Sequence, residues 1–222
     1  WNVAQVATVT GVNDPVDDGD TAYSIITAPA VSAAVRYNGL NAADLSLSNI
    51  DNDTAGITVT PISTTTTESG GTATFSVVLD SQPVANVTIG LSSSNPSEGT
   101  VSVGSVTFSP SNWNVAQIVI VTGVNDAIDD GNRNYSIITA PAVSAAVRFN
   151  GLNGADVSLT NIDNDTAGFL ITPTSGLTTS ETGGTASFTI LLTSQPTANV
   201  TIGLSSSNPS EGTVSVGSVT FT

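Results

Sequence analysis

Carboxylates are the side chains in this sequence whose types and spacing could do chemistry. Between residues 57 and 168 they gather in three places: a turn before an expected strand, the segment Gly123–Gly131 after another expected strand, and a closing Asp-Asn-Asp. If the strands run as their apolar patterns indicate, the three places meet at one pole of the fold. The acidic residues concerned are Glu68, Asp126, Asp129, Asp130, Asp163 and Asp165.

Several carboxylates that converge without a cation disfavour one another's ionised form. Ca²⁺ removes this conflict because it takes six to eight oxygen ligands, whereas Zn²⁺ and Cu²⁺ prefer the His and Cys side chains that this chain lacks. The segment is not an EF-hand loop, since Ile128 occupies its third position and no Glu closes a twelve-residue loop. One alternative stays open: Asp and Asn beside Gly are ordinary turn residues, and an acidic loop can be solvated surface.

Composition excludes several classes of function. The formal net charge is −15, and the only cations are Arg36, Arg133 and Arg148, so we expect no nucleic-acid partner. No apolar run approaches the roughly 18 residues of a membrane span, so we expect no membrane insertion. Without Cys or Lys there is neither a disulfide nor a Lys–Asn cross-link. Without His, Cys or Lys we expect no enzyme, although paired carboxylates can serve a glycosidase.

An internal repeat organises the whole chain. Trp1-Asn2-Val3-Ala4-Gln5 returns 112 residues later at Trp113, and the segment 49–56 returns at 161–168 with the same offset. One inserted residue then makes the offset 113, so that Glu68 corresponds to Glu181. Repeats of this length are typical of tandem arrays of domains.

The repeat predicts three segments. Residues 57–168 form one complete repeat, residues 1–56 the C-terminal half of the preceding repeat, and residues 169–222 the N-terminal half of the following one. We interpret the chain as a piece of a longer repeating polymer. The alternative is a subunit whose two half-repeats are completed by neighbouring chains, and both interpretations predict end-to-end continuation.

Apolar residues alternate with a period of two, which is typical of strands. In the segment 72–79, Ala73, Phe75, Val77 and Leu79 fall on one face, while the segment 115–124 is apolar on both faces and is expected to be a central strand. Gly, Pro, Asn and Ser clusters separate the runs. We therefore predict an all-β protein made of tandem immunoglobulin-like antiparallel sandwiches, with about seven strands per repeat.

The motifs of one repeat resemble the Calx-β family as it occurs in large bacterial surface proteins and adhesins. They are Glu-x-Gly-Gly-Thr-Ala-x-Phe from Glu68, Ser-Val-Thr-Phe before the central strand, two acids four residues apart, and the closing Asp-Asn-Asp. The resemblance implies a Calx-β-like sandwich with Ca²⁺ at its distal tip, bound by Glu68, Asp126, Asp130, Asp163 and Asp165. The loop 92–96 lacks a further Asp that the family supplies, so we expect one or two ions.

The metal prediction extends to both flanking segments. The complete site comprises the six acids of residues 57–168, and adjacent repeats complete two half-sites. The half-site residues are Asp14, Asp17, Asp18, Asp51, Asp53 and Glu181. In contrast, we expect Glu98 and Glu211 to be solvated surface residues, and Trp1 and Trp113 to pack in the core or at a sheet edge.

Taken together, these features predict a structural segment of an extracellular, Ca²⁺-stabilised fibre, stalk or adhesin on a cell surface, which the resemblance implies to be bacterial. Its expected partners are neighbouring repeats or identical chains joined end to end. The alternative is a carbohydrate- or surface-binding β-sandwich module. A surface or glycan ligand bound elsewhere in the parent protein is compatible with either interpretation.

Overall fold

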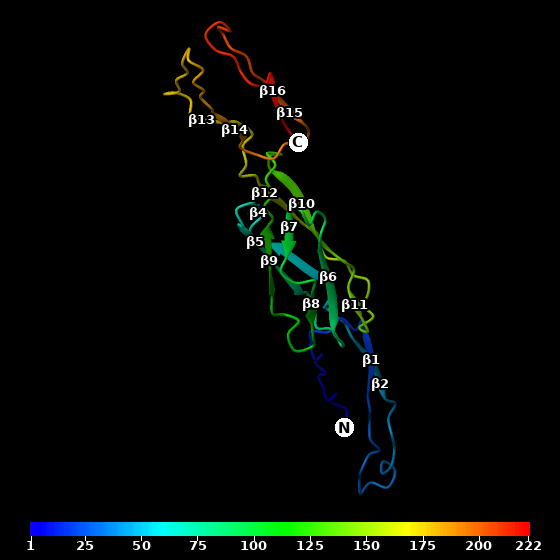
Figure 1. Cartoon of the computed structure of the whole chain (residues 1–222). Helices are drawn as coiled ribbons and strands as arrows, with labels where there is room; N and C mark the ends of the chain where they lie inside the picture. Colours follow the sequence, from blue (N-terminus) through cyan, green and yellow to red (C-terminus); the bar gives the residue numbers. More distant parts are fainter.

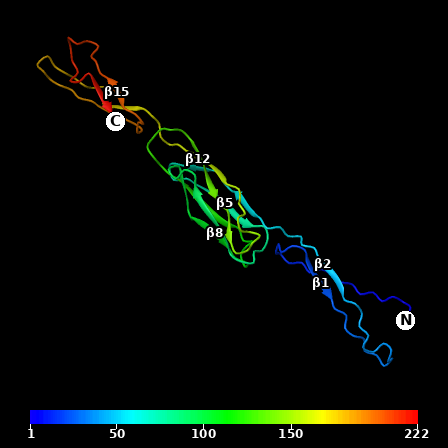
Figure 2. The ribbon, with the colours of Figure 1, turned by 90° about the vertical axis from the view of Figure 1, so that its right-hand side faces the viewer.

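A computed structural model describes all 222 residues as an elongated, all-β chain. Residues 1–56 lie at one end, residues 169–222 at the other, and a β-sandwich lies between them (Figures 1 and 2). No helix of the structure is long and apolar enough to cross a membrane.

The central sandwich is built from ten strands, of which the three shortest are β4, β7 and β11. The sequence predicted about seven strands per repeat, and the three additional ones are only two or three residues long. The strands are β3 (Ile57–Pro61), β4 (Thr65–Thr67), β5 (Thr72–Leu79), β6 (Val87–Ser93), β7 (Gly99–Val101), β8 (Ser105–Phe108), β9 (Gln117–Gly123), β10 (Arg133–Thr139), β11 (Val143–Ser144) and β12 (Val157–Ile162).

These strands form two sheets. One has the order β3-β5-β9-β7, and the other has the order β11-β6-β10-β12-β4, with β8 paired to β6. One pair departs from the predicted antiparallel arrangement, because β4 and β12 run parallel, with Asn161 opposite Thr66. These two residues lie 95 positions apart, so no short turn forces an antiparallel pairing.

The core lies between the two sheets. On β5 the side chains of Ala73, Phe75, Val77 and Leu79 are buried and their neighbours are not, so the strand has the predicted alternation. The core cluster has 18 buried apolar residues, nine from residues 57–112 and nine from residues 113–168. Each half of the repeat therefore supplies half of the core.

Strand β9 is interior within its sheet, as its apolar sequence suggested, since it pairs with both β5 and β7. Only one of its faces is buried, however. Val119 and Val121 point into the core, whereas Ile118 and Ile120 are exposed. The outer face of β9 is therefore apolar and exposed.

The flanking segments form three separate hairpin-like pairs. Strand β1 (Thr21–Ile25) pairs with β2 (Leu45–Asn49), β13 (Phe169–Thr172) with β14 (Thr189–Leu192), and β15 (Val200–Gly203) with β16 (Ser218–Phe221). No residue of 1–56 or 169–222 is buried. Apolar residues of these segments therefore remain in contact with solvent.

The contrast between equivalent residues gives a first test. Phe75 is fully buried, whereas Phe188, at the same position of the next repeat, is 41% exposed. We expect Phe75→Ala to lower the free energy of unfolding by about 3–5 kcal/mol, and Phe188→Ala to lower it by less than about 1 kcal/mol. Urea denaturation of the dilute chain measures both, and equal losses would contradict the assignment of the core to the central sandwich.

Candidate metal centre

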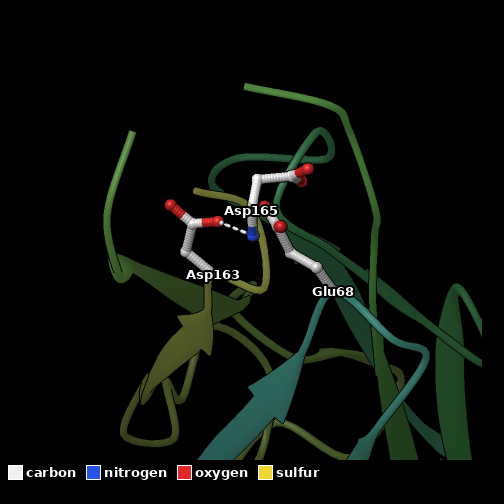
Figure 3. Close-up of side chains that lie close together, drawn as sticks. All are labelled: Glu68, Asp163 and Asp165. Atoms are coloured by element: carbon white, nitrogen blue, oxygen red, sulfur yellow. Dashed lines mark hydrogen bonds between the residues drawn. The ribbon is translucent and has the colours of Figure 1, made fainter. Parts of the chain in front are cut away.

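Two groups of three carboxylates lie at one pole of the central sandwich. Glu68, Asp163 and Asp165 form the first group, and one carboxylate oxygen from each lies within 4.8 Å of the others. Glu68 follows β4 and the two aspartates follow β12, so the parallel pairing of these strands brings the three together (Figure 3).

Glu98, Asp126 and Asp130 form the second group, with the same limit of 4.8 Å between their oxygens. Glu98 lies directly before β7, and the aspartates lie in the loop that follows β9, the partner of β7. Two oxygens bound to one Ca²⁺ at about 2.4 Å are at most about 4.8 Å apart. Both groups are therefore compact enough to hold a metal ion.

Backbone N–H groups fix the first group. Asp163 accepts hydrogen bonds from the N–H of Asp165 at 2.7 Å and from the N–H of Gly131 at 2.6 Å. Gly131 has φ +74°, a left-handed conformation that glycine adopts without strain. The Asp163 carboxylate thereby ties the end of β12 to the loop between β9 and β10.

The second group is fixed in a similar way. Asp126 accepts a hydrogen bond from the N–H of Ile128 at 2.7 Å, and Arg133 Nε donates to Asp130 at 2.7 Å. This ion pair is partly exposed and contributes little to stability. Arg133 nevertheless places one positive charge beside the carboxylates of this group.

A buried polar network lies beneath the two groups. Asn161 is 1% exposed; its Nδ2 donates to the carbonyl of Val124 at 3.0 Å and to Glu98 at 3.4 Å. Its Oδ1 accepts from Thr66, whose hydroxyl also contacts that of Tyr135. Because each buried polar group has a partner, the network holds β4, β10 and β12 in place beneath the carboxylates.

Two carboxylate oxygens at this pole are buried without a hydrogen-bond partner. They are Oδ1 of Asp130 and Oδ2 of Asp165, one in each group. A buried acceptor without a partner is unfavourable unless a cation or another donor meets it. The donor sets contain only oxygen atoms, which suits a hard divalent cation such as Ca²⁺.

Within the first group, the pKa of Glu68 is raised whereas the pKa of Asp163 is lowered. Burial raises the pKa of Glu68, which is 4% exposed, and the nearby Asp163, Asp126 and Asp165 carboxylates raise it further against the opposing effect of the Asn164 N–H. The N–H groups of Asp165 and Gly131 lower the pKa of Asp163. Without a cation, the surroundings therefore disfavour the ionised form of Glu68 and favour the ionised form of Asp163.

The structure distributes the metal-ligand residues predicted from the sequence over two groups and leaves one of them outside both. It brings Glu68, Asp163 and Asp165 into one group, and Asp126 and Asp130 into another. Asp129 belongs to neither, because its carboxylate accepts a hydrogen bond from the N–H of Ala167 at 2.7 Å, in the segment that leads to the next repeat.

Glu98 corrects an expectation. It was predicted to be solvated surface, yet it is 6% exposed and faces Asp126 and Asp130. The pairing of β7 with β9 carries it to the pole, beside Asp126 and Asp130. The only signal in the sequence was the position of Glu98 directly before Gly99, where the strand β7 begins. Glu211 is exposed, as predicted.

The half-site residues show the same local bonds as their equivalents. Asp51 accepts from the N–H groups of Gly19 and Asp53 at 2.6 and 2.9 Å, and the Asp53 and Gly19 N–H groups lower its pKa. Asp14 accepts from Val16, as Asp126 does from Ile128. No group of three acids forms around Asp14, Asp17, Asp18, Asp51 and Asp53, or around Glu181.

Comparisons with known proteins add little to this geometry. No family model matches the chain, and no curated protein matches it. Among solved structures, the apo form of the Calx CBD1 domain is similar, with 14% identity and a TM-score of 0.37, over 50% of this chain and 99% of that one. WR4, an MSP family member from C. elegans, has 14% identity and a TM-score of 0.30, over 49% of this chain and 96% of that one. Similarities this low carry no argument about family or function, and the sandwich rests on its own strand pairing.

The raised pKa of Glu68 predicts how the stability of the chain should change with pH. Its raised pKa means that, without a cation, its contribution to stability is present below the ordinary Glu pKa and is lost as the pH rises through the raised value. Glu68→Gln mimics the protonated form, so we expect a higher melting temperature than wild type at pH 7 in chelator. The difference should shrink as the pH falls through the raised pKa of Glu68 and be smallest below the ordinary Glu pKa.

Thermal melts between pH 4 and pH 7 measure this effect. Glu181→Gln is the matched control, because Glu181 is exposed and lies in no carboxylate group. A lower melting temperature for Glu68→Gln than for the wild type in chelator would contradict the conclusion that ionised Glu68 destabilises the folded chain.

Proposed function

We propose that this chain is a structural segment of an extracellular fibre, stalk or adhesin whose sandwich repeats are stabilised by Ca²⁺. One observation carries the proposal: six carboxylates, including the buried Glu68 and Glu98, converge in two compact groups at the pole beside the following repeat. Such a concentration of charge is unfavourable without a cation, and its ligand atoms suit calcium.

Contacts between consecutive repeats support a role for this pole in joining them. The N–H of Gln82 donates to the carbonyl of Pro15 at 2.7 Å, and the N–H of Gln195, at the equivalent position, donates to the carbonyl of Ala127 at 2.6 Å. In both cases the acidic loop of one repeat touches a turn of the next. The same contact thus recurs at both junctions in the chain.

An ion pair adds to the first junction. Asp17 accepts from the N–H of Ala55 at 2.8 Å through Oδ2, and its Oδ1 lies 3.5 Å from Nε of Arg148 in the next repeat. Asp129, its equivalent, makes the same bond to Ala167. We therefore assign Asp17 and Asp129 to the junction and leave Ca²⁺ binding to the two compact groups.

Binding of calcium to the folded state alone would stabilise the repeat by linkage. At about 100 times the dissociation constant, one ion adds roughly 2.7 kcal/mol. Extracellular calcium modules bind with dissociation constants of about 10⁻⁴–10⁻³ M, so such a device suits the outside of a cell better than the cytosol. The family resemblance favours a cell-surface location, which we propose to be bacterial.

A carbohydrate-binding role lacks a platform in the central sandwich. The large aromatic residues that are exposed, Trp1, Tyr37, Phe169 and Phe188, all lie in the flanking segments. Trp113 packs against the core, and Phe149, the equivalent of Tyr37, is buried. The positions of these aromatic residues therefore favour a structural role over carbohydrate binding by the central sandwich.

Calcium removal tests the proposal. We expect Ca²⁺ at about 100 times its dissociation constant to raise the melting temperature of the chain by roughly 5–10 °C over that in chelator for each group that binds an ion, from about 2.7 kcal/mol per site and 2–4 °C per kcal/mol. Asp126→Asn with Asp130→Asn should remove the contribution of the second group. Differential scanning calorimetry with and without Ca²⁺ measures both effects.

The matched control is Asp80→Asn with Asp156→Asn, which removes the same charge outside the two groups. This control should keep the full response to Ca²⁺. Identical melts of the wild type in calcium and in chelator would refute the proposal.

The junction makes a separate prediction. Arg148→Ala should broaden the distribution of distances between spin labels placed on residues 1–56 and on the central sandwich, because it removes the ion pair with Asp17. Arg36→Ala is the matched control, since Arg36 holds the equivalent position and makes no salt bridge. Electron paramagnetic resonance on the dilute chain measures the widths, and equal widths for both variants would count against an ionic contribution at the junction.

A further inference from the structure

We propose that Asn153 is a site of spontaneous deamidation in the folded chain, where water converts it to aspartate and isoaspartate. The residue lies in the loop between β11 and β12, at the opposite end of β12 from the carboxylate groups. The inference rests on the hydrogen bonds of this loop and of the other Asn-Gly and Asp-Gly pairs. It is independent of the proposed function.

The reaction begins at the peptide bond that follows an asparagine. The backbone nitrogen of the next residue attacks the side-chain Cγ and bonds to it, while the Cγ–Nδ2 bond breaks and the amide leaves as ammonia with the proton of the backbone N–H. Water then opens the resulting succinimide ring at either carbonyl, which gives aspartate or isoaspartate. Glycine favours the attack because it has no Cβ to crowd the ring and its backbone turns most freely.

The chain contains five pairs in which glycine follows asparagine or aspartate. In two of the three Asn-Gly pairs, the glycine N–H that must react already donates a hydrogen bond. Gly39 donates to the carbonyl of Ala30 at 2.7 Å, and Gly151 donates to the carbonyl of Ala142 at 2.8 Å. The five pairs are Asp18-Gly19, Asn38-Gly39, Asp130-Gly131, Asn150-Gly151 and Asn153-Gly154.

Both Asp-Gly pairs are held by a second carboxylate. Gly131 donates to Asp163 at 2.6 Å, and Gly19 donates to Asp51 at 2.6 Å. Each bond keeps the glycine nitrogen on a carboxylate other than that of the aspartate directly before it. We therefore expect Asp130, a member of the second carboxylate group, to resist the corresponding isomerisation.

Gly154 is the exception among the five glycines. Its N–H donates to no group of the chain, although the residue is buried and its carbonyl accepts a hydrogen bond from the Thr139 hydroxyl at 2.8 Å. Buried backbone N–H groups without a partner are rare in folded proteins. The nitrogen that must react therefore lacks the bond that protects the other four.

The asparagine side chains differ in the same way. Oδ1 of Asn150 accepts a hydrogen bond from the N–H of Ser144 at 3.2 Å, and Oδ1 of Asn38 accepts one from the N–H of Ser32 at 3.1 Å. Asn153 is exposed, lies outside any strand or turn, and forms no hydrogen bond through its side chain or its backbone. Its Cγ can therefore reach the nitrogen of Gly154 without breaking a hydrogen bond of the chain.

The preceding repeat provides an internal comparison. Asn41 is equivalent to Asn153, but the residue that follows it is Ala42 instead of glycine. The Cβ of Ala42 crowds the attacking nitrogen. Of the two repeats that contain this loop, only the central one combines a free N–H with a glycine.

Deamidation would change how this loop packs on β3. A Cβ at position 154 would lie 2.9 Å from Cγ2 of Val59, so the backbone of Gly154 is packed closely against that strand. Isoaspartate brings the Cβ of residue 153 into the main chain, which lengthens the backbone by one atom directly before Gly154. The hydrogen bond from Thr139 must then shift, whereas ordinary aspartate at this exposed position adds only a negative charge.

Hydroxylamine tests the site, because it cleaves the chain where a succinimide forms. In native buffer we expect one cut in the full chain, between residues 153 and 154. In concentrated urea we expect cuts at all three Asn-Gly pairs, since unfolding releases the N–H groups of Gly39 and Gly151. The variant Asn153→Ser should lose the native cut and keep the other two in urea. A native cut after Asn150 as strong as that after Asn153, or none after Asn153, would overturn the proposal.

Tandem mass spectrometry of the chain aged in ¹⁸O-labelled water measures the rates without a cleaving reagent, since each converted residue takes up labelled oxygen. In the folded chain we expect Asn153 to convert about fivefold faster than Asn150 or more, the factor that one protecting hydrogen bond of typical strength provides. Asn41 should also convert more slowly than Asn153. In urea the rates of Asn153 and Asn150 should converge. Equal rates in the folded chain would mean that the hydrogen bonds give no protection, and the assignment of Asn153 would be wrong.

Discussion

The structure depends on the convergence of carboxylates at one pole of a sandwich that is otherwise uncharged inside. Glu68 and Glu98 are almost fully buried beside four aspartates, and two of the aspartate oxygens have no hydrogen-bond partner. The scaffold holds these groups in place with backbone N–H donors to Asp163 and Asp126. A site whose ligands are fixed before an ion arrives needs little reorganisation to bind it, but it concentrates the repulsion among its charges in the free state. Its stability should therefore respond to the cation more strongly than that of a mobile acidic loop.

The core residues are divided equally between the two halves of a repeat, and this division explains which contacts persist in the flanking segments. Each half of a repeat contributes equally to the buried cluster, and the strand pairs within one half persist where the other half is missing. Burial does not persist, because the apolar face of one half has nothing to pack against. Local pairing thus belongs to the half-repeat, whereas the core belongs to the union of two halves. Neighbouring units in repeat proteins depend on each other in the same manner.

Much of this organisation could be read from the sequence because it rests on local patterns. The period of two located the strands, and the clustering of acids identified five of the six residues in the two groups. Glu98 was missed because it follows a Ser-Asn-Pro-Ser turn typical of a surface, and its burial depends on the pairing of β7 with β9. Asp129 lies outside both groups, and the hydrogen bond that it accepts from the N–H of Ala167 could not be read from its proximity in sequence to Asp126 and Asp130. The parallel β4–β12 pair, and the exposure of Ile118 and Ile120, likewise depend on contacts between distant segments.

The loop between β9 and β10 connects ion binding to the geometry of the array. It carries Asp126 and Asp130, which belong to the second group, and also Ala127, whose carbonyl accepts a hydrogen bond from Gln195 of the next repeat. Asp129, between them, binds the N–H of Ala167 in the linker. One short segment therefore contributes to both the candidate metal centre and the junction. Under the proposed function, a cation that orders this loop also fixes the position of the next repeat. The stiffness of the array and the stability of the sandwich should therefore depend on calcium over the same range of concentration.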